Sequence, residues 1–319
     1  MARGMGATPR RRRRRVVGMR PPRRPPERAG GPVLWIALVL LPVAGLGWAF
    51  VPLSPLVAHV PAAHRGPASN GLDWIATRDG HMIDGAGRAI LLRGFNVDSL
   101  LEDGVRHADL TDTDAQLMES SGVSVVRLPF SWGLLEPQRG IVDTAYLDRI
   151  AAGVDLLARH DIHTILALHI RDWSAHYGGS GAPDWATAAL VFPDFRSWLP
   201  SNWGTHINPA MNAATTYFWL SPDWQADYSL VWRAVAQRFV DSSAVAGYDL
   251  YNEPHPLPIP PRIFEQQYMW PFSARLVDEI GSVDPNHLFL VEGIFFGDYG
   301  TSMRRCSGPR SVPSNAGAT

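Results

Sequence analysis

The chain has 319 residues, enough for one large domain or two ordinary ones, and its 46% apolar content can fill a sizeable core. A single cysteine, Cys306, excludes both an internal disulfide framework and a metal site built from cysteines. The formal net charge of −1 hides an asymmetry, because residues 1–28 carry 11 arginines against one acid and the remainder carries 18 arginines against 29 acids. A basic tail on an acidic body can indicate a nucleic-acid partner, but the next segment argues against one.

Residues 33–51 (VLWIALVLLPVAGLGWAFV) are uncharged and mostly apolar, and they are long enough to cross a bilayer. The arginines on their N-terminal side predict a cytoplasmic N-terminus under the positive-inside rule. We therefore expect a single-pass signal anchor, an Arg-rich disordered cytoplasmic tail at residues 1–32, an extracytoplasmic body and no nucleic-acid partner. The alternative is a cleaved signal peptide and a secreted protein, although residues 1–32 are long for such a leader.

The rest of the chain divides by composition. Residues 52–72 are rich in Pro, Ala and Gly and are typical of a linker. Residues 73–300 carry the periodic apolar patterns of a folded domain, whereas residues 301–319 show no strand signal and are expected to be a disordered tail. The folded part begins with two short strands predicted within residues 81–92 around a Gly-rich turn. The second of these strands continues through residues 93–97.

Strands and helices then alternate along the chain. Apolar runs predict buried strands at residues 123–129, 162–169, 245–254 and 288–292. The intervening helices are expected after Thr111 or Thr113, at residues 146–159, after the Ser221-Pro222 cap, and at residues 264–280 with a bend at Pro271. This alternation predicts an α/β fold of parallel βαβ units. Polar residues at successive strand ends favour a (β/α)8 TIM barrel over a doubly wound sheet, with about five of the eight units present.

The most informative strand reads VAGYDLYNEP, residues 245–254. Its apolar run fits a strand that is buried on both faces, and Pro254 must end it because proline cannot donate to a strand ladder. Glu253 is therefore expected at the carboxyl end of a strand, where α/β barrels place catalytic residues.

Four short motifs at strand ends support each other. They are Arg93-Gly94-Phe95-Asn96, Val126-Arg127-Leu128-Pro129, Leu168-His169 and Asn252-Glu253-Pro254. Together with FSWGLLEPQRG at residues 130–140, they resemble glycoside hydrolase family 5, the cellulase-type barrels. The segments LLRGFNVDS and HYGGSGAPDWA, residues 91–99 and 176–186, are most similar to the endoglycoceramidase-like branch of that family.

This resemblance implies a retaining β-glycosidase that needs no metal or cofactor. It makes Glu253 the general acid/base. It also implies that Asn252 bonds the sugar's 2-hydroxyl, that His169 contacts the sugar and that Arg127 keeps the nucleophile carboxylate ionised. Asn96 is a further expected substrate-binding residue. Asp172 is expected to match a substrate-binding aspartate, although two residues separate it from His169 where the family pattern has one.

About fifty residues between the third strand and Ser221 show no clear periodicity, and loops of this length are usually functional. They contain five tryptophans, including Trp173, and Tyr177, which could offer flat faces to sugar rings or a groove to a lipid. The alternative is that these aromatic side chains pack the loop onto the barrel.

The expected substrate is a glycolipid or oligosaccharide, and the expected membrane contact is through residues 33–51. A β-glucan or mannan endo-hydrolase is the alternative enzyme, because acid/base geometry does not report the aglycone. The family's nucleophile is a glutamate on the seventh strand, and the chain has strand signals only as far as the fifth. We therefore expect a C-terminally truncated barrel that does not hydrolyse glycosides as this chain alone. A non-catalytic carbohydrate-binding pseudoenzyme is the corresponding alternative.

Overall fold

A computed structural model describes residues 71–98, 100, 109–187, 208–256 and 258–294. Its centre is a five-stranded parallel sheet in the order β3-β4-β5-β6-β7, so that strands neighbouring in sequence are also neighbours in space. The strands are Gly94–Asn96, Val125–Phe130, His163–Leu168, Val245–Asp249 and Leu288–Leu290. This sheet confirms the predicted parallel α/β class and the five predicted strands.

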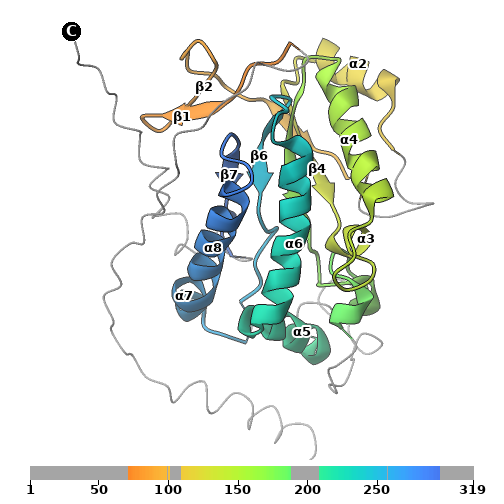
Figure 1. Ribbon diagram of the computed structural model, residues 1–319, viewed down its shortest axis with the longest axis vertical. Helices are drawn as coiled ribbons and strands as arrows, with labels where there is room; N and C mark the ends of the chain where they lie inside the picture. The colour runs from red at the N-terminus through yellow and green to blue at the C-terminus, as the bar shows by residue number, and fades with distance from the viewer. Residues whose placement is uncertain (1–70, 99, 101–108, 188–207, 257, 295–319) are drawn as a thin grey trace, which may run out of the picture. The chain divides into compact units, whose positions relative to one another are not determined.

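Helices α4, α6 and α8 cover one face of this sheet (Figure 1). Helices α2, α3 and α4 are Asp112–Ser120, Trp132–Leu135 and Thr144–Ala158. Helices α5, α6, α7 and α8 are Pro209–Leu220, Pro222–Phe239, Pro261–Phe264 and Trp270–Gly281. The ring of Trp232 in α6 packs against Phe130 of β4 and Tyr248 of β6, with centroids 5.3 and 5.5 Å apart. Burial of such rings between helix and sheet fixes α6 over the middle strands.

Helix starts follow the predicted caps. The Thr111 side chain accepts a hydrogen bond from the Asp114 amide and forms a capping box at the start of α2. Ser221 caps α6 in the same way, by accepting from the Trp224 amide, with Pro222 in the first turn.

Two elements differ from their predicted form. Residues 264–280 are not one helix bent at a proline: α7 passes into a π-helical segment, Glu265–Met269, before α8 begins. Pro271 has no backbone N–H, so the hydrogen-bond ladder is interrupted there, and the wider turns immediately precede it. Helix α5 lies inside the region that showed no periodicity, because its apolar residues occur on all sides and leave no stripe.

The N-terminal hairpin is displaced from its predicted position. Strands β1 and β2 are Ala76–Arg78 and His81–Ile83, and they turn at Asp79-Gly80. The turn that was predicted at residues 84–87 connects only an isolated bridge, between Ile83 and Ala89. Side chains of the sheet domain hold the start of this region, since Ser243 Oγ donates to the Leu72 carbonyl.

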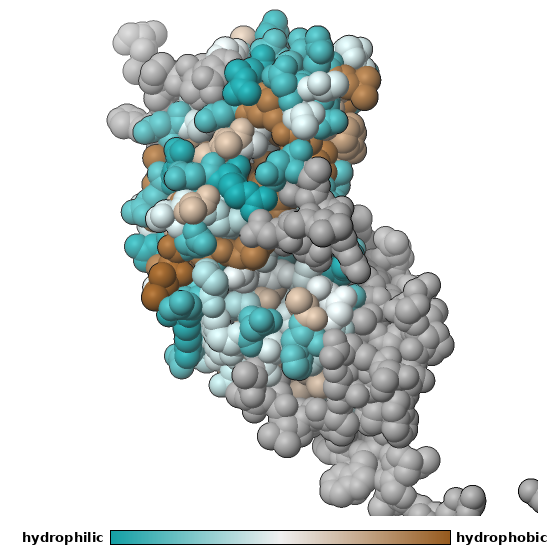
Figure 2. All heavy atoms as spheres, turned by 90° about the vertical axis from the view of Figure 1, so that its right-hand side faces the viewer, coloured by the Kyte–Doolittle hydropathy of each residue, from teal (hydrophilic) through white to brown (hydrophobic). Residues whose placement is uncertain are grey.

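The sheet has open edges within the described residues, because β3 and β7 each pair on one side only. Phe95 of β3 is 50% exposed and the nearby Leu91 is 79% exposed. Figure 2 shows apolar patches among a largely hydrophilic surface on the face that it presents. Unpaired strand edges of this kind can pair with further chain or with other molecules.

No helix in the described part of the chain is both long enough and apolar enough to span a membrane. The predicted anchor at residues 33–51, the tail at 1–32, most of the linker and the tail at 301–319 lie outside the described residues. The predicted domain boundaries and the membrane anchor therefore stay predictions.

Candidate active site

The carboxyl ends of the parallel strands bring most of the predicted site residues to one edge of the sheet. Arg127 of β4 is in register with Asn96 of β3, and Asn252 and Glu253 follow β6. Glu292 follows β7. Residues that are 165 positions apart in the chain are thereby held within hydrogen-bond distance of one another.

The Arg127 guanidinium is the hub of this site. It donates from Nε to Asp249 Oδ2 over 2.7 Å and from Nη1 to Asn96 Oδ1 over 2.8 Å. Its Nη2 donates to Glu292 Oε1 over 2.8 Å and to Asn252 Oδ1 over 3.0 Å. The planar fork of an arginine suits several fixed acceptors at once. The predicted residues Asn96, Arg127 and Asn252 are therefore joined directly.

Asp249 is the site residue that the sequence pattern did not single out. Its side chain is buried, and Oδ1 has no partner among the described residues. Burial, aided by the negative charge of Glu292, raises the pKa of Asp249 to about 7 despite the contact with Arg127. One guanidinium shared among four acceptors does not offset the cost of burying this charge. An aspartate inside an apolar strand was the available signal, because a buried acid needs a partner.

His169 follows β5 and is largely buried. Burial, together with the charges of Arg127 and Arg171, lowers the pKa of His169 to about 4. The imidazole is therefore neutral at physiological pH, and it can both donate and accept hydrogen bonds. Its Nδ1 has no partner among the described residues, which suits a side chain that bonds a ligand.

Glu253 and Glu292 meet at the end of β6. The Glu253 amide donates to Glu292 Oε2 over 2.9 Å. Glu253 has φ of 45°, in the left-handed region, where a non-glycine residue stores about 1–3 kcal/mol of strain. Asn252 anchors the preceding turn, because its Nδ2 donates to the Ile170 carbonyl over 3.2 Å. Strained residues held by such contacts concentrate at active sites.

The loop after β5 folds back onto the strand end. Its Arg171–Ser180 bridge closes a short hairpin. Gly181 has a φ of 112°, and a Cβ at this position would lie 2.3 Å from the His169 carbonyl oxygen. Only glycine fits there. Asp172 lies in this loop and lines a cavity of about 30 Å³ together with Glu253, roughly the space of one water molecule.

Trp173 lines the same small cavity but is only 1% exposed. Its ring packs between Trp132, Phe218 and Trp224, with centroids 5.6 to 6.1 Å apart. Trp173 therefore holds the loop on the domain and does not present a free ring face to a sugar. Trp219, in α5, is also buried. For these described residues the structure supports the packing alternative rather than a stacking platform, because the rings find partners in α5 and α6.

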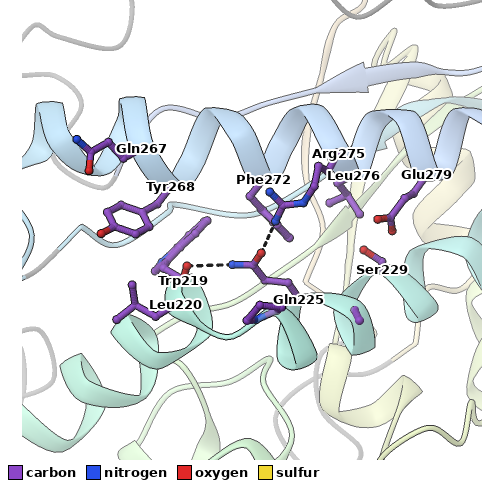
Figure 3. A pocket seen from close by; sticks show the side chains of 12 residues that line it. Trp219, Leu220, Gln225, Ser229, Gln267, Tyr268, Phe272, Arg275, Leu276 and Glu279 are labelled. Atoms are coloured by element: carbon purple, nitrogen blue, oxygen red, sulfur yellow. Dashed lines mark hydrogen bonds between the residues drawn. The ribbon is translucent and has the colours of Figure 1, made fainter. Parts of the chain in front are cut away.

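A larger cavity, of about 340 Å³, lies away from this edge, between α5–α6 and the π segment with α8 (Figure 3). None of the predicted site residues lines it.

Several solved structures are similar to this chain. A crystal structure of an endogalactoceramidase is 29% identical, has a TM-score of 0.64, and the match covers 71% of this chain and 54% of that one. Endo-glycoceramidase II from Rhodococcus sp., solved as a lactosyl-enzyme intermediate, is 32% identical with a TM-score of 0.60 over 66% of this chain and 51% of its own. The same enzyme has been solved as a ganglioside GM3 complex, at 31% identity and a TM-score of 0.61 over 67% and 51% of the two chains.

Among curated proteins, Endoglycoceramidase I of Rhodococcus hoagii (strain 103S) is 34% identical over 180 residues, 55% of this chain and 36% of the relative. The chain thus spans about half the length of the solved structures and about a third of that curated relative. The family model for cellulase (glycosyl hydrolase family 5) matches residues 83–315, well over half of the 319 residues. The chain therefore belongs to glycosyl hydrolase family 5.

Proposed function

We propose that this edge of the sheet is the acid/base half of a retaining β-glycosidase site that takes the sugar head group of a glycolipid. The observation that supports it most is the Arg127 hub, which fixes Asn252 and Glu292 beside Glu253. In such a site Glu253 gives its proton to the departing glycosidic oxygen as the bond to the anomeric carbon breaks. Asn252 positions the adjacent hydroxyl, and neutral His169 bonds the same ring.

The glycolipid substrate is supported by the relatives. Endoglycoceramidases recur among them, and one has been solved in complex with ganglioside GM3. The lactosyl-enzyme intermediate of that relative supports the retaining course. A β-glucan or mannan is the alternative substrate, because the acid/base geometry at Glu253 does not report the aglycone.

Glu292 follows the fifth strand of the sheet, whereas the family resemblance places the nucleophile on the seventh. Glu292 accepts from Arg127 on one oxygen and from the Glu253 amide on the other, over 2.8 and 2.9 Å. A retaining enzyme needs a carboxylate oxygen that can approach the anomeric carbon, about 5 Å from the acid. We therefore expect this chain alone to bind the sugar without turning it over, which is the behaviour of a carbohydrate-binding pseudoenzyme.

We also propose that the domain acts outside the cytoplasm, held at the membrane through residues 33–51. The support is the arginine-rich segment that precedes this apolar run. Protease treatment of intact cells that express the chain with a C-terminal tag tests it. Loss of the tag supports the topology, and a protected tag contradicts it.

The substrate is tested with fluorescent lactosylceramide in micelles and with soluble β-glucan and mannan, offered to the wild-type chain and to Glu253→Gln and Glu292→Gln. We expect saturable binding of the lactosyl head group and no sugar release. Binding or turnover only of glucan or mannan would exclude the glycolipid proposal. Turnover lost in Glu253→Gln but kept in Glu292→Gln would contradict the inactivity, and loss in both variants would make Glu292 the nucleophile.

A further inference from the structure

The larger cavity lies on the helical side of the sheet, where none of the proposed catalytic residues contributes to it. Figure 3 shows the π segment and α8 along one wall and the end of α5 with the start of α6 along the other. Its volume of about 340 Å³ falls at the small end of the range of ligand sites, about 300–1,000 Å³. The space therefore suits a ligand of one or two sugar rings in size.

Gln225 lines this cavity and is held in place by hydrogen bonds. It is buried, and its Nε2 donates to the carbonyls of Phe218 and Trp219, each over 3.0 Å. Its Oε1 accepts from Arg275, and Figure 3 draws the contacts of Gln225 with Trp219 and with Arg275. The guanidinium of Arg275 is thereby oriented, yet no carboxylate pairs with it among the described residues. Its remaining N–H groups are available to an acceptor on a ligand.

Trp219 lines the same cavity, and its side chain is buried. It is 3% exposed, and its indole N–H has no hydrogen-bond partner in the described part of the chain. Buried donors are rarely left without an acceptor in native proteins. This N–H is closed off from solvent, so Trp219 offers the cavity its ring surface rather than a hydrogen-bond donor.

The π segment brings further polar groups to the cavity. Gln267 and Tyr268 lie on it and line the cavity, whereas Gln266, the preceding residue, does not. Such π turns frequently occur at functional sites. Glu279 lies further along α8, one turn beyond Arg275. The wall therefore carries one cation, one anion and amide groups, interspersed with aromatic rings.

This composition selects a class of ligand. A phosphate would meet the Glu279 carboxylate, and a simple cation would meet Arg275. A lipid chain would strip water from a guanidinium and amides that it cannot bond. A neutral saccharide offers both donors and acceptors to the polar groups and C–H faces to the rings. We propose that this cavity is a second carbohydrate site, for a neutral mono- or disaccharide, separate from the site at Glu253.

The test is equilibrium binding of lactose and cellobiose to the full-length chain in a sugar-free detergent, followed by calorimetry and by saturation-transfer NMR. We expect two sugars per chain. Gln267→Ala should weaken one of the two sites about fivefold and Arg275→Gln about tenfold, the sizes of one neutral and one charge-assisted hydrogen bond. Gln266→Ala and Arg233→Gln are matched controls on the same segment and on α6, outside the cavity, and they should bind as the wild type does.

His169→Ala distinguishes the site at Glu253 from the larger cavity, because it should abolish sugar binding only at Glu253. If the proposed function is wrong, no sugar will bind at Glu253, but the binding that depends on Arg275 will remain. Sugar binding that is lost entirely in His169→Ala and unchanged in Gln267→Ala and Arg275→Gln would overturn the second site. Absence of any sugar binding would overturn it as well, and displacement of the sugar by inorganic phosphate would show that the ligand class is wrong.

Discussion

Replacing Asp249 by asparagine should change how the stability of the domain depends on pH. Burial raises the pKa of Asp249 from 3.8 to about 7, so the folded state binds more protons than the unfolded state between these values. By linkage, the wild type loses stability from this group as the pH rises through that window, by about 4 kcal/mol in all. Asparagine keeps the size and an acceptor for Arg127 but does not titrate, so this loss should disappear.

His169 acts in the opposite direction over nearly the same range. Its pKa falls from 6.5 to about 4 on folding, so the unfolded state binds more protons there and stability rises with pH, by about 3 kcal/mol. In the wild type the two groups largely cancel between pH 4 and 6.5. In Asp249→Asn the unfolding free energy should therefore rise with pH, and in His169→Gln it should fall with pH. In the double variant it should be nearly independent of pH.

The assay is urea unfolding followed by tryptophan fluorescence at pH values from 4.5 to 7.5. Differences between variants remove the titrations that all four proteins share. If the unfolding free energy of Asp249→Asn runs parallel to that of the wild type across this range, the carboxyl at β6 does not titrate where its burial implies. The same outcome for His169→Gln would show that the imidazole is not desolvated by the loop after β5.

Two further changes test the framework that positions the site. Gly94→Ala should prevent the pairing of β3 with β4, because a Cβ at Gly94 would lie 1.6 Å from the Val125 carbonyl oxygen. Urea unfolding should therefore show a large loss of unfolding free energy. The control Gly153→Ala in α4 should keep an unfolding free energy within about 1 kcal/mol of the wild type. Ser221→Ala should cost about 1 kcal/mol, because the Trp224 amide at the start of α6 loses its acceptor. The exposed Ser282→Ala is the control. If Ser221→Ala lowers the urea midpoint less than Ser282→Ala does, Ser221 does not stabilise the start of α6.

Local signals were sufficient to predict the framework. The five strands are short apolar runs ended by polar residues, and the caps at Thr111 and Ser221 act within four residues of themselves. The convergence of Asn96, Arg127 and Asn252 followed from one geometric fact, that carboxyl ends of parallel strands share an edge.

What the sequence did not indicate depends on contacts between distant segments. Asp249 looked like part of an apolar strand, and its importance appears only when Arg127, 122 residues earlier, lies beside it. Helix α5 carries apolar residues on its exposed side as well, including Tyr217 and Leu220, so no stripe marked it. Trp173 has the composition of a sugar platform, and only the packing of Trp132 and Trp224 shows that its ring faces are covered.

The most direct test of the proposed half-site uses azide as an external nucleophile. With fluorescent lactosylceramide, whose alkoxide leaving group needs a proton, and sodium azide, the azide should attack the anomeric carbon, the bond to the leaving oxygen should break, and Glu253 should supply the proton. We expect no product without azide, α-lactosyl azide with it, and at least a tenfold slower reaction in Glu253→Gln. Hydrolysis to lactose without azide, lost equally in Glu253→Gln and Glu292→Gln, would contradict this and show that Glu292 completes the site.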